Sequence, residues 1–103
     1  MTGEGPHYAL ELVKALIANR RYRVTLTASH GAGSLGLDEG DVVDCVLALD
    51  ESHFLKSMDS LKVAGLQQDV YRPRWAGFDL YVKVQIVGEH PADTAVIISF
   101  KRR

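Results

Sequence analysis

Residues 78–87 alternate cleanly between apolar and polar side chains. The apolar set is Phe78, Leu80, Val82, Val84 and Ile86. Because successive side chains of a β-strand point to opposite faces of a sheet, this period of two predicts a strand with one buried face and one solvent-facing face. A fold of this chain must therefore cover one side of a sheet and leave polar side chains on the other.

The spacing of the apolar residues changes at about residue 54. Before that point they recur as in a helix, and after it they alternate as in strands. Residues 22–27 fit either a short strand or the approach to a helix. Helices followed by consecutive strands indicate one α+β domain over residues 1–103, with N-terminal helices packed on one face of an antiparallel sheet. The expected helices cover residues 7–20 and 38–49, the second with Asp38 as its N-cap, and the expected strands cover residues 54–58, 66–75, 78–87 and 94–101.

The last two strands are expected to form a hairpin. A turn at residues 89–93 pairs Tyr81 with Lys101 and Lys83 with Ser99 on one face of the sheet. The same register pairs Val84 with Ile98 on the other face, where both side chains are apolar. The turn therefore predicts which side chains of the C-terminal strand are buried.

A second hairpin is expected around a two-residue loop at residues 76–77. Its register pairs Arg72 with Tyr81 and Gln68 with Gln85. The two hairpins together gather polar residues on one face, namely Gln68, Arg72, Arg74, Tyr81, Lys83 and Lys101. The opposite face carries Tyr71, Leu80, Val82, Val84, Ile98 and Phe100, which are suited to contact the helices.

The charge of the chain is distributed unevenly between its two halves. Residues 1–53 hold four Lys or Arg and eight Asp or Glu, whereas residues 54–103 hold eight Lys or Arg and five Asp or Glu. Such an asymmetry suggests an anionic partner for the second half. The polar face is thus either an ordinary solvent-exposed surface or a surface that holds a phosphodiester.

Several other kinds of protein do not fit the sequence. No apolar stretch approaches the roughly 20 residues that cross a bilayer, and no signal-peptide pattern opens the chain, so we expect a cytoplasmic protein without a membrane partner. The single cysteine, Cys45, cannot form an intramolecular disulfide and is expected to be a buried hydrophobic residue.

Known cofactor and metal motifs do not account for the sequence either. Residues 31–36 match G-x-G-x-x-G, but the strand before them lacks the continuous apolar run of a dinucleotide-binding fold, which favours a turn or a helix end. The four histidines have no metal-ligand spacing. We therefore expect no cofactor and no metal.

Two segments are more specific than these patterns. Lys-Ser-Met at residues 56–58 is followed by Gln-Asp-Val-Tyr-Arg-Pro-Arg at residues 68–74, and later by Tyr81, Lys83 and the ending Ile-Ile-Ser-Phe-Lys at residues 97–101. In this order they closely resemble the MqsR family of toxins. The resemblance implies a RelE-like α+β fold and a ribosome-independent endoribonuclease that cleaves messenger RNA. The polar face has no cluster of Asp and Glu, so we expect the cleavage to proceed without a metal.

The resemblance also implies roles for particular residues. Lys56, Gln68, Tyr81 and Lys101 match positions that the family uses at or near its active site, and Met58 and Arg72 match the same neighbourhood. We expect Lys56, Gln68, Arg72, Tyr81 and Lys101 to be catalytic and Met58, Arg74 and Lys83 to contact RNA.

The chain departs from the family at Leu55 and Gln67, where the family often has aromatic rings that could stack on bases. This departure leaves open an alternative, a non-catalytic RNA- or protein-binding module that keeps the toxin fold. A third reading is a small scaffold that only pairs with another protein. The resemblance further implies an antitoxin of the MqsA type that binds by extending the sheet at an exposed edge.

Overall fold

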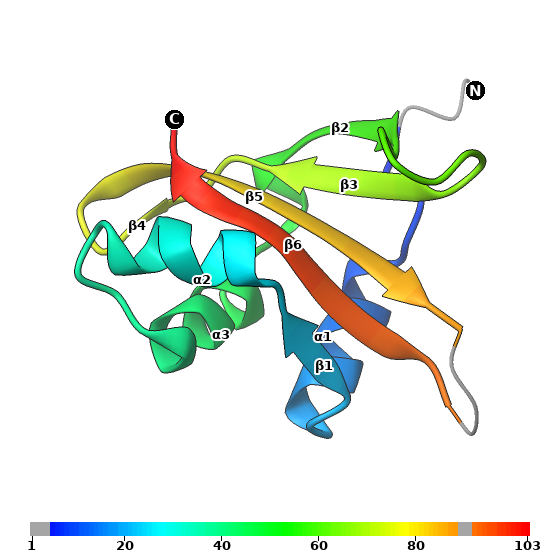
Figure 1. The fold of residues 1–103 in the computed structure, drawn as a ribbon, viewed down its shortest axis with the longest axis horizontal. Helices are drawn as coiled ribbons and strands as arrows, with labels where there is room; N and C mark the ends of the chain where they lie inside the picture. The colour runs from blue at the N-terminus through cyan, green and yellow to red at the C-terminus, as the bar shows by residue number, and fades with distance from the viewer. Residues whose placement is uncertain (1–4, 89–91) are drawn as a thin grey trace.

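The computed structural model describes residues 5–88 and 92–103, and its elements follow the predicted order closely (Figure 1). The helices are α1 (Leu10–Ala18), α2 (Leu26–Gly33), α3 (Glu39–Leu47) and a 3₁₀ turn, η1 (Glu51–His53). The strands are β1 (Tyr22–Val24), β2 (Phe54–Asp59), β3 (Gln67–Tyr71), β4 (Arg74–Trp75), β5 (Phe78–Val87) and β6 (Thr94–Arg102). The turn predicted at residues 89–93 falls largely outside the described residues.

The strands lie in the order β1-β6-β5-β3-β2, and β4 pairs with β5 beside this path. The α+β class and the antiparallel meander of β2, β3, β5 and β6 are confirmed. The sheet as a whole is mixed, because β1 pairs with β6 in parallel beside this antiparallel meander. A parallel pair needs a long connection, and most of the chain lies between these two strands.

The hairpin of β5 and β6 follows the predicted register only at its open end. Tyr81 lies opposite Lys101 and Lys83 opposite Ser99, as expected. The register then shifts, so that Val84 faces Ile97 rather than Ile98. The placement of Ile98 on the buried face is therefore wrong: a β-bulge adds one residue to β6, Ile97 joins the core, and Ile98 is only partly buried outside it.

The hairpin between β4 and β5 is confirmed in full. Ala76 and Gly77 have φ values of 55° and 82°, the two positive values that a tight two-residue turn between antiparallel strands requires. The strand predicted over residues 66–75 is interrupted between β3 and β4 at Pro73, which has no N–H to donate. Its carbonyl still accepts a hydrogen bond from the Leu80 N–H at 2.9 Å.

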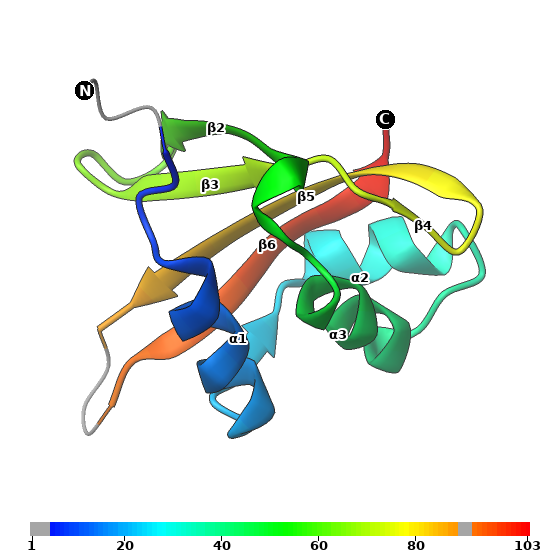
Figure 2. The same cartoon turned by 180° about the vertical axis from the view of Figure 1, so that it is seen from behind.

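The helices and one face of the sheet share a single core. Helices α1 and α3 cover this face, and α2 runs alongside β6 (Figures 1 and 2). Cys45 lies in this core as predicted, and burial raises the pKa of its thiol to about 12. The largest fully buried side chains are Tyr71, Phe100, Leu49, Leu80, Ile97, Val13, Val42, Val46, Val70, Val82, Val84 and Asp69.

Helix α2 is longer than the predicted turn or helix end at residues 31–36. Gly31 packs so closely on β6 that a Cβ atom there would lie 1.9 Å from the Phe100 carbonyl oxygen. Gly36, with φ of 76°, follows the helix in a conformation that favours glycine. The glycine motif therefore serves helix packing and helix termination. In the described part of the chain, no helix is long and apolar enough to cross a membrane.

Candidate active site

The face of the sheet that the core leaves open carries a row of residues across neighbouring strands. Lys56 of β2 lies opposite Val70 of β3, Val70 opposite Lys83 of β5, and Lys83 opposite Ser99 of β6. Adjacent strands are about 4.8 Å apart, so two strand spacings separate the backbones of Lys56 and Lys83. Val70 is fully buried between them. The register thus brings Lys56 and Lys83 to one surface.

A second row lies beside the first and is centred on Tyr81. Two ammonium groups lie near its ring, with Nζ of Lys101 at 5.1 Å and Nζ of Lys83 at 6.0 Å from the ring centroid. Both distances lie within the range of a cation–π interaction. We call Lys56, Arg72, Tyr81, Lys83 and Lys101 the cationic face.

Arg72 joins this face from the end of β3. It follows Val70 by two positions and therefore lies on the same face. The residue pairs of β3 with β5 before it and of β4 with β5 after it keep one register, in which Arg72 is opposite Tyr81. Its backbone N–H donates to the His53 carbonyl at 2.7 Å. The turn η1 therefore holds the backbone of Arg72 next to the beginning of β2.

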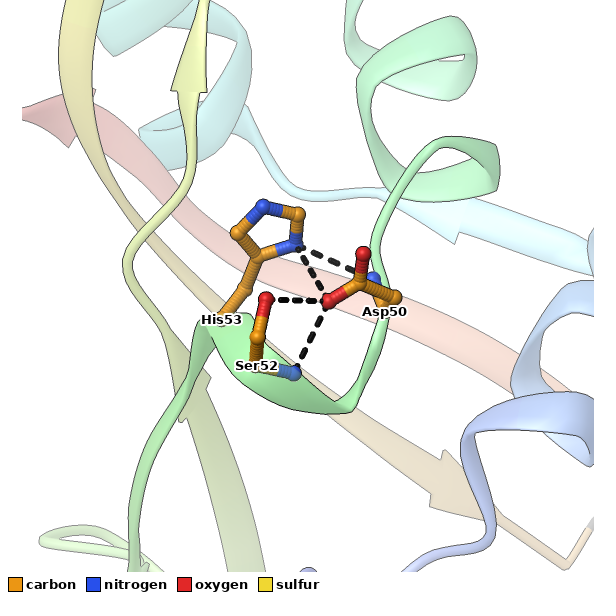
Figure 3. A network of polar contacts seen from close by, with 3 residues as sticks. All are labelled: Asp50, Ser52 and His53. Carbon is orange, nitrogen blue, oxygen red and sulfur yellow. Dashed lines mark hydrogen bonds and ion pairs between the residues drawn. The ribbon is translucent and has the colours of Figure 1, made fainter.

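A small polar network closes η1 (Figure 3). The Asp50 carboxylate accepts hydrogen bonds from the Ser52 N–H, at 2.8 Å, and from the Ser52 hydroxyl. These bonds are the main reason that the pKa of Asp50 lies below its usual value. His53 Nδ1 accepts the Asp50 N–H at 3.0 Å and lies 3.6 Å from the Asp50 carboxylate. The backbone of Asp50 and the ring of His53 therefore close the turn together.

Among the described residues, no carboxylate compensates the cations of this face. Within residues 5–88 and 92–103, Lys56, Arg72, Lys83 and Lys101 form no ion pair. Burial, followed by the charges of Lys101 and Lys56, lowers the pKa of Lys83. Like charges held close together in a folded protein favour the binding of an anion.

Gln68 and Met58 extend the cationic face along β3 and β2. They lie opposite each other, on the same side of the sheet as Lys56. Gln68 is 7% exposed, and its Nε2 donates to Oε1 of Gln85 at 3.0 Å. The predicted pairing of Gln68 with Gln85 is reproduced by this bond.

Arg74 stands apart from the other predicted residues. It lies on β4, opposite Asp79, and its guanidinium donates to the Asp79 carboxylate at 3.0 Å. Arg103 lies 3.6 Å from the same carboxylate. The bond from Arg74 is the first cause that lowers the pKa of Asp79. The charge of Arg74 is therefore already compensated within the chain.

The two departures from the family lie in different places. Gln67 is opposite Asp59, to which it is hydrogen-bonded, and the alternation of β3 sets it on the face opposite to Gln68. Leu55 is exposed at a register shift between Phe54 and Lys56. A ring at position 67 would point away from the cationic face.

Two residues near the site were not among the predicted site residues. Gln85 and Ser99 both appear in the predicted hairpin registers, opposite Gln68 and Lys83. The alternation of polar and apolar residues along β5 and β6 could have assigned both residues to the face that carries the site. Among the described residues, no group of three or more His, Cys, Asp or Glu could hold a metal ion.

Comparisons with known proteins show the family of the chain. Residues 5–102 match the sequence profile of a family described as "Motility quorum-sensing regulator, toxin of MqsA". The chain is 35% identical over 98 residues to the mRNA interferase toxin MqsR of Escherichia coli (strain K12), and the alignment covers 95% of each chain. The match spans the helices, the sheet and every residue of the cationic face. The chain therefore belongs to the MqsR toxin family.

Proposed function

We propose that this chain is the toxin of a toxin–antitoxin pair and that it acts as an mRNA interferase, an endoribonuclease that cuts single-stranded messenger RNA. The observation that carries the proposal is the set of cations around Tyr81 on an open sheet face, which form no ion pair with any described residue. Family membership and the name of the E. coli relative support it.

RNA supplies its own nucleophile for this reaction. The 2′-oxygen attacks the adjacent phosphorus, a new P–O2′ bond forms, and the P–O5′ bond breaks. The products are a 2′,3′-cyclic phosphate and a free 5′-hydroxyl. The protein has to take the 2′ proton, stabilise the added charge on the phosphoryl oxygens, and give a proton to the leaving oxygen. None of these steps requires a metal.

The lysines of the cationic face can take the 2′ proton and stabilise the added charge on the phosphoryl oxygens. A lysine is a proton acceptor only in its neutral form, and the lowered pKa of Lys83 increases that fraction. Lys83 thus becomes a second candidate base beside Lys56, which matches a position that the family uses at or near its active site. The lysine that is not the base remains a fixed cation beside the phosphate, together with Lys101.

The remaining residues bind and orient the phosphodiester. The fork of the Arg72 guanidinium suits two non-bridging phosphate oxygens. The hydroxyl of Tyr81, whose ring lies near the ammonium groups of Lys83 and Lys101, is the candidate proton donor to the leaving oxygen. Gln68 orients the ribose or the phosphate, and Met58 contacts the RNA beside it.

Alanine substitutions test these assignments. Lys56→Ala, Arg72→Ala and Tyr81→Ala should each lower the rate of RNA cleavage about 100- to 1,000-fold while the fold persists. Lys14→Ala, which removes the same charge from α1, serves as the matched control and should cleave like the parent. Cleavage should also persist in EDTA. If all three variants cleave at the parent rate, the site is elsewhere.

The alternative, a binding module without activity, predicts that purified protein retains RNA but creates no new ends. Mapping the ends of a long RNA after incubation separates the two functions. The position of Gln67, on the face away from Lys56, removes one reason to favour the inactive module.

We also propose an MqsA-type antitoxin that adds a strand to the outer edge of β2. In the described sheet, β2 pairs only with β3, and the other edge strand, β1, has only three residues. A strand added there would lie beside Lys56 and Met58. Growth of cells that express the chain should recover when the neighbouring gene product is co-expressed, and continued toxicity would contradict this pairing.

A further inference from the structure

A groove of about 330 Å³ opens on the same side of the sheet as the cationic face. Ligand pockets in proteins begin at about this volume. Lys83 and Gln68 line the groove and also belong to the proposed active site, so the groove and the site are continuous. Thr25 and Thr27 at the beginning of α2 line one side, and residues 60–63 of the connection between β2 and β3 line the other.

The bulge in β6 shapes the floor of the groove. Without the register shift after Lys83, Ile98 would point into the core, opposite Val84. The extra residue instead gives the core position to Ile97, and Ile98 lines the groove. Bulges commonly redirect a side chain next to an active site. Here the redirected side chain places an apolar surface beside Lys83.

The wall formed by the β2–β3 connection is also apolar. Leu61 is 91% exposed and Val63 is 54% exposed, although both are large hydrophobic residues. Leu66, at the end of the same connection, lines the groove with them. Aliphatic side chains on the floor and on one wall suit a flat, unstacked ring better than a hydrated ion.

A pair of amides supplies the polar part of the groove. Gln68 and Gln85 are each 7% exposed, and the single bond from Nε2 of Gln68 to Oε1 of Gln85 joins them. No described residue bonds to the other ends of these amides, which are Oε1 of Gln68 and Nε2 of Gln85. If both side-chain amides are rotated so that their oxygen and nitrogen atoms exchange places, one oxygen acceptor and one NH₂ donor group still remain without a partner in the pair. The pair therefore offers an acceptor and donors side by side to whatever enters the groove.

We propose that this groove holds one nucleobase of the RNA, next to the cleaved phosphate, and that Gln85 determines which base is preferred. The inference rests on the proposed RNA cleavage. Proteins that read single-stranded RNA bond the edges of unstacked bases, and amide side chains match the adjacent donor and acceptor of a base edge. Lys83 would bind the phosphate while Gln85, two residues along the same strand, reads the base.

The test replaces the amide and maps where a long RNA is cut. Gln85→Leu should still cleave, within about tenfold of the parent rate, but its preference for one base beside the cut should fall by about tenfold, the discrimination of one good base contact. Gln85→Glu has only acceptors and should shift the preference toward bases with amino donors. Gln67→Leu makes the same change on the other face of the sheet and should keep the cut pattern of the parent.

The outcomes separate this inference from the proposed function. Thermal unfolding of each variant identifies any that fail to fold, and Gln85→Glu, which keeps the shape of the side chain, then decides. If folded Gln85 variants cut at the same sites with the same base distribution as the parent, the groove does not read a base. If the parent itself leaves RNA intact, the proposed function fails, and the inference fails with it.

Discussion

The two faces of the sheet differ in whether their charged groups have partners within the described chain. On the helix-covered face, the Asp69 carboxylate is fully buried. It accepts hydrogen bonds from the backbone N–H groups of His7 and Tyr8, at 2.9 and 2.8 Å, and one from the Ser57 hydroxyl at 2.7 Å. These bonds hold the segment before α1 against β2 and β3. The charge of Asp69 is thus used to complete the fold.

The open face leaves its charges without partners. Lys56, Lys83 and Lys101 surround the same stretch of sheet, and the described chain brings no carboxylate to them. Folding gains nothing from this proximity, since like charges oppose each other. The comparison teaches that a charged group with several internal partners belongs to the structure, while charged groups gathered without partners are available for a ligand.

The largest expected effect comes from comparing substitutions of two cations in the same half of the chain. Lys101→Met removes a cation without an ion pair, and RNA cleavage should slow about 100- to 1,000-fold. Arg74→Met removes a cation that Asp79 already compensates and should slow cleavage only several-fold. Single-turnover rates on a short RNA measure both. Equal losses in the two variants would show that charge alone, and not the lack of a partner, marks the site.

Stability provides the second test. Asp69→Ala leaves the N–H groups of His7 and Tyr8 and the Ser57 hydroxyl without their acceptor, and should lower the free energy of unfolding by about 3 kcal/mol. Lys83→Met, on the open face, should leave it unchanged or slightly higher, because a like-charge contact is lost. Urea unfolding measures both. A stable Asp69→Ala variant would mean that the segment before α1 is held by other contacts.

The third test concerns the helix alongside β6. Gly31→Ala would place a methyl group against the Phe100 carbonyl and should lower the free energy of unfolding by about 2 kcal/mol. Gly33→Ala, in the same helix with open space around its Cβ, should be neutral or gain up to about 1 kcal/mol from helix propensity. Thermal unfolding would show whether the two glycines differ as expected. Similar behaviour would mean that α2 can move away from β6 without cost.

Much of this arrangement could be predicted from sequence because local patterns determine it. The alternation of residues 78–87 predicted β5 with its observed bounds. Asp38 caps α3 as expected, in a reciprocal pair of hydrogen bonds with Asp41. The loop at residues 76–77 set the register that brings Lys83 next to Val70. These features depend on neighbours in the chain, which a sequence displays directly.

The parts that sequence missed depend on packing between distant segments. Helix α2 has small and polar residues in place of an apolar stripe, and only its contact with β6 explains Gly31. The bulge that moves Ile98 has no local signature either. No role was predicted for Asp69, although its register on the face of Val82 could have indicated a buried one. The groove was missed because residues 60–66 and α2 meet only in three dimensions.

The smallest expected effect tests whether the cations of the open face interact. The folded protein lowers the pKa of Lys83 below its usual 10.5, through burial first and then through Lys101 and Lys56. Between the lowered value and 10.5, the unfolded chain binds more protons than the folded one. The free energy of unfolding should therefore rise with pH across that window. Lys83→Met should remove this part of the slope.

Lys101→Met should raise the pKa of Lys83 only part of the way to 10.5, because burial, the larger cause, remains. Titration of the lysine side chain by NMR measures that shift directly. Bound phosphate should raise the same pKa, since an anion favours the charged amine. A pKa of Lys83 that neither change moves would show that the cations are too far apart to act on one phosphate. The open face would then be solvated surface, and its contrast with the buried carboxylate of Asp69 would carry no function.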